Sequence, residues 1–152
     1  MNEISQKIAN GCLLTAGPLD DFNTMTIGWG MIGTIWGKEV FMVFVRPTRY
    51  TYEFMQRHEY FTVSFYNTNF KREMSYLGTK SGKDSNKVEE VHFVPLAIGD
   101  GVTFKQAYET LLCHTIYHQD MDINCFPEAV VNRYYAGGGI HRLYIGEIIR
   151  QE

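Results

Sequence analysis

The chain has 152 residues, a length that favours one domain over residues 1–152 with a hydrophobic core that needs no disulfide bonds. Hydrophobic residues make up 45% and aromatic residues 14% of the sequence, which excludes intrinsic disorder, collagen-like repeats and a polar coiled coil. A formal net charge of -3 argues against a general nucleic-acid binder, because such proteins neutralise phosphates with an excess of Lys and Arg.

Neither a targeting segment nor a membrane-spanning segment is predicted. The first ten residues are polar, and no stretch approaches the roughly 18 apolar residues that span a bilayer. Cys12, Cys113 and Cys125 show no CxxC spacing and no neighbouring second pair, so a structural zinc site is not expected. We therefore expect a cytoplasmic protein with reduced, mostly packed thiols and no contact with membranes.

In the first half of the chain, apolar runs predict strands. Residues 11–16 form a short run, and residues 40–45 (VFMVFV) form an unbroken one that predicts a strand buried on both faces. Residues 25–36 mix β-branched, aromatic and glycine residues without a helical period. Residues 48–58 change to a helical period with Thr48 as the expected N-cap, and residues 60–66 alternate as a strand does.

The second half continues with short elements, in the order helix 70–77, polar loop 78–87, strand 91–95, strand 107–117, helix 127–135 and strand 140–149. The whole chain thus contains seven or eight strands and two or three short helices, a mainly β class. Alternation of strand, helix and strand is absent. We therefore predict a largely antiparallel closed barrel with appended helices and not a doubly wound sheet.

Residues 28–33 (GWGMIG) match the pattern G-x-G-x-x-G of dinucleotide-binding sites. Such a site needs a helix to begin there, because the pyrophosphate lies on its N-terminus. The residues that follow, 34–38, predict a strand and a turn. The glycines therefore indicate a close approach of the backbone to something flat, or relief of barrel curvature.

Residues 46–51 (RPTRYT) place two guanidinium groups and two hydroxyl groups where a strand enters a helix. The N-terminus of a helix binds anions, and Arg adds bidentate charge. A phosphate site and a solvated helix cap with surface arginines are equal alternatives for this segment alone. The loop at 78–87 lacks the spacing of a Walker loop, and His114 and His118 have no evident third ligand, so no metal site is predicted.

Five segments in a fixed order carry a resemblance to a known family: residues 23–30 (NTMTIGWG), 43–51 (VFVRPTRYT), 61–65 (FTVSF), 78–84 (GTKSGKD) and 141–148 (HRLYIGEI). From about Gly11 to Ile149, the chain resembles the flavin reductase-like family of FMN-binding split barrels, particularly its flavoredoxin-like branch. The resemblance implies a split β-barrel that forms a homodimer, with one FMN per subunit at or near the subunit interface.

The resemblance also implies roles for particular residues. The isoalloxazine would be lined by Met25, Thr26, Ile27, Gly28 and Trp29, with Asn23 beside them. The phosphate and ribityl chain would be held by Arg46, Thr48, Tyr50 and Thr51. The loop with Ser81 and Lys83 would close over the flavin. His141 matches a late histidine of the family near the nicotinamide or substrate. In many members that histidine follows Gly-Asp, whereas Gly139-Ile140 precedes it here.

The function expected from the resemblance is an NAD(P)H-dependent flavin reductase, with NADH or NADPH as the reductant. A flavoredoxin-like electron carrier that serves an acceptor protein is the second hypothesis, and a non-enzymatic binding protein on the same fold is the third. The flavin supplies the redox chemistry and the protein supplies position and electrostatics, so no catalytic side chain is assigned beyond a positioning role for His141.

Overall fold

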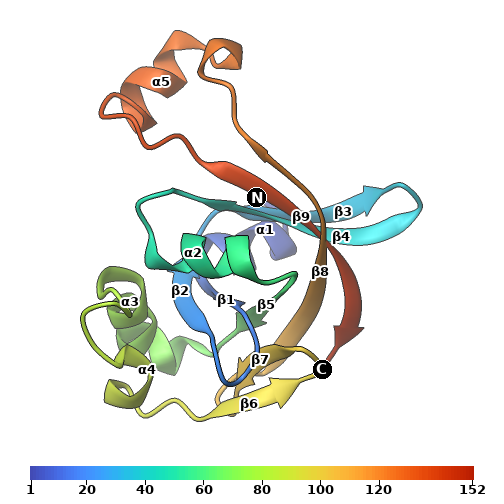
Figure 1. Ribbon diagram of the computed structural model, residues 1–152, viewed down its shortest axis with the longest axis vertical. Coiled ribbons are helices and arrows are strands. Elements are labelled where there is room, and N and C mark those ends of the chain that lie inside the picture. Colours follow the sequence, from blue (N-terminus) through green and yellow to red (C-terminus); the bar gives the residue numbers. More distant parts are fainter.

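The computed structural model describes residues 1–152 and contains nine strands and five short α-helices (Figure 1). The strands are β1 (Cys12–Ala16), β2 (Asn23–Ile27), β3 (Gly30–Ile35), β4 (Lys38–Val45), β5 (Tyr60–Phe65), β6 (Pro95–Ile98), β7 (Gly101–Phe104), β8 (Glu109–Asp120) and β9 (Arg142–Gln151). The helices are α1 (Glu3–Ala9), α2 (Tyr50–Arg57), α3 (Lys71–Thr79), α4 (Lys87–Glu90) and α5 (Glu128–Tyr134), with 3-10 turns at Thr68–Phe70 and Ile123–Cys125. The predicted mainly β class is confirmed.

Seven strands form one antiparallel sheet in the order β2-β1-β5-β8-β9-β4-β3, and β6 and β7 form a separate hairpin. The long strand β8 pairs with both β5 and β9, and its register against β9 shifts between Leu112 and Cys113 and again between Thr115 and Tyr117. Such irregularities bend a strand and let the sheet curl. The sheet therefore wraps into a barrel in which every pairing is antiparallel, as expected.

The barrel is not closed, which corrects the prediction of a closed one. The terminal strands β2 and β3 do not pair with each other. Helix α3 lies against β2 instead, where the Thr26 hydroxyl donates a hydrogen bond to the Met74 carbonyl. A helix that covers an edge strand replaces the missing strand partner. The fold is thus a split barrel with its opening at β2.

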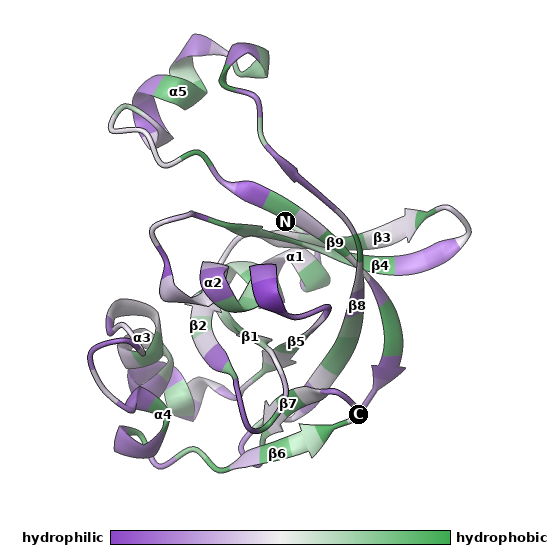
Figure 2. Ribbon diagram, viewed as in Figure 1, coloured by the Kyte–Doolittle hydropathy of each residue, from purple (hydrophilic) through white to green (hydrophobic).

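Two apolar clusters hold the sheet and helices together. The larger cluster fills the barrel and includes Phe41, Phe61 and Phe65, while the smaller includes Leu13, Met74 and other side chains between β1, α3 and the β7 hairpin. Strand β1 is buried along its whole length because it contributes to both clusters. Figure 2 shows hydrophobic residues along β4 and β9 and hydrophilic residues on parts of α2 and α3.

Strand β4 corrects the expectation that residues 40–45 are buried on both faces. Val43 and Val45 are buried in the barrel, whereas Met42 and Phe44 on the other face are half-buried. The apolar run alone could not show that one face of the strand borders a hollow, because a run without alternation fits several environments.

The predicted strand at 91–95 is wrong. Residues 91–92 form a turn after α4, in which His92 has a φ of 61°, and the strand begins only at Pro95. Helix α1 and strand β7 were not predicted. None of the helices is long and apolar enough to cross a membrane. No disulfide forms: Cys12 and Cys113 are buried and Cys125 is exposed.

Candidate functional site

Three hollows lie in a row beside the opening of the barrel, and neighbouring hollows share lining residues. The central slot, of about 200 Å³, is lined by Met25, Thr26, Ile27, Gly28, Trp29, Phe44, Arg46, Arg49 and His141. The cationic pocket, of about 140 Å³, is lined by Asn23, Met25, Thr48, Arg49, Tyr50, Thr51, Thr79, Lys80, Ser81, Gly82 and Lys87. The apolar cavity, of about 660 Å³, shares Gly28, Trp29, Phe44 and His141 with the slot.

The central slot gathers the residues at the end of β2 that the sequence singled out. Residues 25–29 form one wall, and Phe44 from β4 lies among the lining residues. The hydroxyl of Thr26 is engaged by the Met74 carbonyl, so the end of β2 is fixed to α3. The Trp29 side chain is 49% exposed, with its ring in edge contact with Tyr134 at a centroid distance of 5.2 Å. The slot is therefore narrow and borders aromatic rings.

Arg46 fastens a distant loop to the end of β4. Its guanidinium donates hydrogen bonds to the carbonyls of Tyr134, Gly138 and Gly139, and lies 5.3 Å from the centre of the Tyr135 ring. Arg46 lines the central slot and not the cationic pocket. Its charge thus reaches the slot, while its hydrogen bonds order the segment that leads to His141.

His141 lies between the slot and the apolar cavity. The side chain is buried, and its Nδ1 atom is 2.7 Å from the Tyr135 hydroxyl, the partner that orients the ring. Burial, with a smaller contribution from the nearby charge of Arg46, lowers the pKa of His141 to about 4. At pH 7 the imidazole is neutral, so it can act in a hydrogen bond but carries no charge.

The cationic pocket is built on the start of α2, which corrects the predicted cap. The helix begins at Tyr50 with Arg49 at the N-cap position, and no side chain caps it. Residues 46–49 form a turn closed by a hydrogen bond from the Arg49 N–H to the Arg46 carbonyl, which delays the helix beyond Thr48. Uncapped N–H groups at a helix start favour an anion. Thr48, Tyr50 and Thr51 all line this pocket.

Three cations, Arg49, Lys80 and Lys87, line the cationic pocket without an acidic partner; Lys80 is exposed, and Arg49 and Lys87 are withdrawn from water. Lys87 is only 3% exposed, and its Nζ atom donates hydrogen bonds to the carbonyls of Leu77 (2.8 Å) and Lys80 (2.9 Å). Arg49 donates to the Gly78 carbonyl at 3.0 Å, and neither side chain forms an ion pair. Burial, with the charge of Arg49, lowers the pKa of Lys87 to about 8.

Sequence reasoning included Arg49 in the candidate phosphate segment at 46–51, although the family resemblance gave it no role, and it placed Lys87 in a polar surface loop. Lys87 ends a polar run that predicts a solvated loop. Lys87 is buried because α3 and the loop at residues 80–86 fold back over it. No local sequence pattern predicts that arrangement.

The loop at residues 80–86 reaches the pocket through Ser81 and Gly82. A Cβ atom on Gly82 would lie 2.1 Å from Asn23 Oδ1, so the loop and β2 approach each other closely only because this residue is glycine. Asn23 in turn donates from Nδ2 to the Thr51 hydroxyl at 2.9 Å. Lys83 is exposed and lies outside the lining of all three hollows.

The apolar cavity lies between α1 and the arm, by which we mean residues 121–141 with α5. None of its lining residues carries a charged side chain, since His141 is neutral. A hydrogen bond from the Met121 N–H to the His141 carbonyl closes the base of the arm. The site is thus graded from an apolar end, through the slot, to a cationic end.

The open antiparallel barrel, with an elongated groove beside its unpaired edge, defines a split-barrel protein of the flavin reductase-like class. Residues 7–152 match the family model described as the flavin reductase like domain, and the chain belongs to that family. A search of curated proteins finds no match.

Solved structures with the same fold include three from different organisms. Flavoredoxin of Methanosarcina acetivorans is similar with a TM-score of 0.74 at 21% identity, over 93% of this chain and 67% of that one. An FMN-binding protein of Thermus thermophilus has a TM-score of 0.72 at 16% identity, over 93% and 68%. The NADH:FAD oxidoreductase SgcE6 of Streptomyces globisporus C-1027 has a TM-score of 0.70 at 13% identity, over 93% and 73%.

Proposed function

We propose that the chain binds FMN and passes electrons from NADH or NADPH through it, as an NAD(P)H-dependent flavin reductase. The observation that carries the proposal is the unpaired charge of Arg49 and Lys87 in one pocket at the start of α2. Lys87 is buried and Arg49 is half-buried. Cations that are withdrawn from water without a counter-ion are costly, and a phosphate group from a ligand removes that cost. The descriptions of similar proteins as FMN-binding and as an NADH:FAD oxidoreductase support this assignment.

The residues of the groove fit the three parts of FMN. Arg49, Lys87 and the hydroxyl groups of Thr48, Thr51 and Ser81 would hold the phosphate and ribityl chain. The slot between residues 25–29 and Phe44 would hold the ring system, and the exposed ring of Trp29 lies at its mouth. Arg46 borders the slot and would place positive charge beside the ring.

Bound FMN supplies the hydride and electron transfer chemistry, so the protein needs no acid or base of its own. His141 has a different task. It is neutral and held by Tyr135, and it faces both the slot and the apolar cavity, so it can orient a nicotinamide or another substrate by a hydrogen bond. The apolar cavity presents a non-polar surface on that side of the ring.

Titration with FMN and with riboflavin tests the binding step. We expect a flavin spectrum, one FMN per chain, and weaker binding of riboflavin because it lacks the phosphate. Arg49→Gln should weaken FMN binding by roughly tenfold or more, the range for a hydrogen bond to a charged group. Arg72→Gln, an exposed change on α3, is the control. A colourless protein that takes up no FMN would contradict the proposal.

Anaerobic mixing of the FMN-loaded protein with NADH and NADPH tests the reductase step. Rapid bleaching of the flavin supports a reductase, and slower bleaching in His141→Ala supports the positioning role. Bleaching only by a chemical reductant or by a partner protein would show a flavoredoxin-like carrier instead, the alternative that the resemblance left open.

A further inference from the structure

The apolar cavity opens on the central slot, so a molecule bound there would lie against the ring system of a flavin. The two hollows share Gly28, Trp29, Phe44 and His141. The volume of the cavity, about 660 Å³, is within the range of about 300–1,000 Å³ for pockets that enclose a small molecule. The proposed reaction has NADH or NADPH as the electron donor, and the occupant of this cavity is the candidate for the acceptor.

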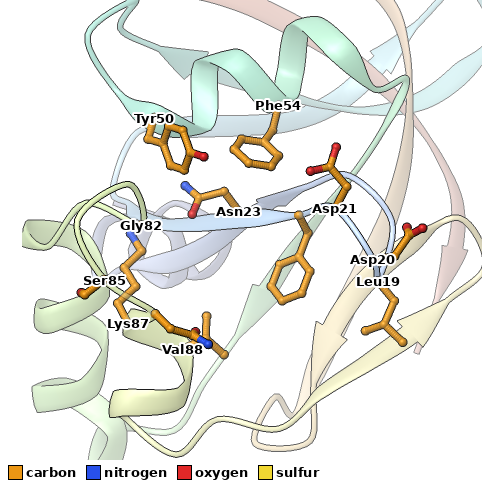
Figure 3. Close-up of a pocket in the computed structure, with 12 residues that line it drawn as sticks. Leu19, Asp20, Asp21, Asn23, Tyr50, Phe54, Gly82, Ser85, Lys87 and Val88 are labelled. Atoms are coloured by element: carbon orange, nitrogen blue, oxygen red, sulfur yellow. The ribbon is translucent and has the colours of Figure 1, made fainter.

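Charged side chains gather at the opposite end of the groove. Beyond the cationic pocket lies a fourth hollow of about 420 Å³, with Lys87 at one end and Asp20 and Asp21 at the other (Figure 3). The apolar cavity has no charged side chain among its lining residues, since His141 is neutral. A charged group would lose its hydration there without gaining a partner. The cavity therefore selects an uncharged occupant.

Aromatic rings form much of the wall of the apolar cavity. Trp29 and Tyr134 meet edge to face at a centroid distance of 5.2 Å. The rings of Phe44, Phe126 and Tyr135 also line the cavity. Aromatic side chains pack against other flat rings in offset stacks or edge contacts. These walls therefore favour a flat ring compound over an aliphatic chain.

His141 offers such a compound one directed hydrogen bond. Its Nδ1 atom lies 2.7 Å from the Tyr135 hydroxyl, and no group of the chain forms a hydrogen bond with its Nε2 atom. A tyrosine hydroxyl that donates to Nδ1 keeps the proton of a neutral imidazole on Nε2. His141 can then donate from Nε2 to a carbonyl oxygen of the occupant.

We propose that the apolar cavity binds a small uncharged quinone, which is the electron acceptor. The proposal rests on the proposed flavin-binding function. A quinone is flat and uncharged, and it presents carbonyl oxygen atoms to His141. In the overall reaction NADH gives up a hydride, which is two electrons and one proton, and becomes NAD⁺. The quinone takes up two electrons and two protons and becomes a hydroquinone, and the second proton comes from water.

The absence of an acid from the cavity wall favours a quinone over other carbonyl compounds. No lining side chain is a carboxylic acid or a lysine. Reduction of a carbon–carbon double bond beside a carbonyl group requires a proton donor at carbon. A quinone takes up its protons on oxygen, where water can supply them, so the side chains of this cavity suffice for its reduction.

Tryptophan fluorescence measures the binding of duroquinone, an uncharged quinone whose ring carbons are all substituted, so that it does not add to the exposed Cys125 thiol. Trp36→Phe leaves Trp29 as the only tryptophan, and we expect duroquinone to quench its fluorescence to saturation. Val130→Asp places a carboxylate in the cavity wall and should weaken binding at least about tenfold. Ile123→Asp places the same charge on the arm outside the cavity and should not.

Tyr135→Phe keeps the ring in the wall but removes the hydroxyl group that orients His141. We expect roughly fivefold weaker binding of duroquinone, within the range for one hydrogen bond. Tyr108→Phe, the same change at an exposed position outside the cavity, should have no effect. Quenching that does not saturate, or equal binding by Val130→Asp and Ile123→Asp, would overturn the proposal.

Anaerobic mixing of the reduced, FMN-loaded protein with duroquinone tests the electron transfer. We expect the absorbance of the oxidised flavin to return at a rate that saturates with the quinone concentration, with the dissociation constant that fluorescence gives. A rate that rises without saturation, or no return of the absorbance, would overturn the acceptor and leave FMN binding and NADH oxidation standing. A protein that takes up no FMN would instead contradict the proposed function. The fluorescence titration of the flavin-free protein would still decide whether the cavity binds a quinone.

Discussion

At the scale of single residues, Lys87 makes a prediction about pH. Its pKa is lowered to about 8 by burial and by the charge of Arg49, so the free protein loses this charge as the pH rises through about 8. A bound phosphate would hold the proton on Lys87. We therefore expect the affinity for FMN to fall above pH 8, by up to about tenfold per pH unit. Fluorescence titrations between pH 7 and 10 measure this slope.

Two variants show whether the slope belongs to Lys87. Lys87→Met should bind FMN more weakly at pH 7 and lose the slope, whereas Lys71→Gln on the exposed face of α3 should keep it. The stability of the free protein should change in the opposite direction. Because the unfolded chain binds this proton more tightly, the contribution of Lys87 to the free energy of unfolding rises between pH 8 and 10.5. A slope that survives in Lys87→Met would assign the titration to another group.

At the scale of elements, the close approach of the 80–86 loop to β2 shapes the cationic pocket, which both segments line. Gly82→Ala would place a Cβ atom 2.1 Å from Asn23 Oδ1, so the loop or the amide must move. Overpacking of this kind costs about 1–3 kcal/mol. We expect weaker FMN binding and a lower melting temperature. Gly33→Ala on β3, where an added Cβ meets nothing within 4 Å, should leave both unchanged. Equal effects of the two substitutions would show that loop packing does not shape the site.

Sequence patterns predicted the elements in which the spacing of apolar side chains matches the period of a strand or a helix. The sequence of strand β5 alternates between apolar and hydroxyl side chains, although Thr62 and Ser64 are buried as well. The inward positions of α3, Met74 and Leu77, follow a helical period. The failure at 91–95 has a different origin. Phe93 belongs to the smaller apolar cluster and Val91 packs against it, so both are apolar for a reason other than a place in a sheet. A short apolar run cannot distinguish these two reasons.

The same limit applies to the site. The residues of β2 and of the segment 46–51 are contiguous in sequence, so a motif could indicate them. Lys87 and Phe44 join the site only through tertiary packing, and Thr48 lost its predicted capping role to the turn before it. Motifs thus predicted the segments that line the groove. The charge distribution of the groove depends on how α3 and the loop at residues 80–86 pack around those segments, which motifs do not show.

At the scale of the whole molecule, exposed apolar side chains gather around the apolar cavity. Trp29, Met31 and Tyr134 are 49%, 52% and 40% exposed, and all three line it. The arm that forms one wall projects away from the barrel (Figure 1). Large exposed apolar patches mark interaction sites, and a projecting arm with an apolar inner side suits a second subunit. We therefore propose that this surface forms the interface of the homodimer that the family resemblance implies.

Analytical ultracentrifugation tests this interface. We expect the protein to sediment as a dimer and Met31→Asp to weaken dimerisation by at least roughly tenfold, because a buried carboxylate without a partner opposes association. Leu96→Asp places the same charge at an exposed apolar position on β6, away from the cavity, and should remain dimeric. Since Trp29 and His141 line both the cavity and the central slot, loss of the dimer should also weaken FMN binding. A dimer that tolerates Met31→Asp would place the interface elsewhere, and a wild-type monomer would contradict the homodimer itself.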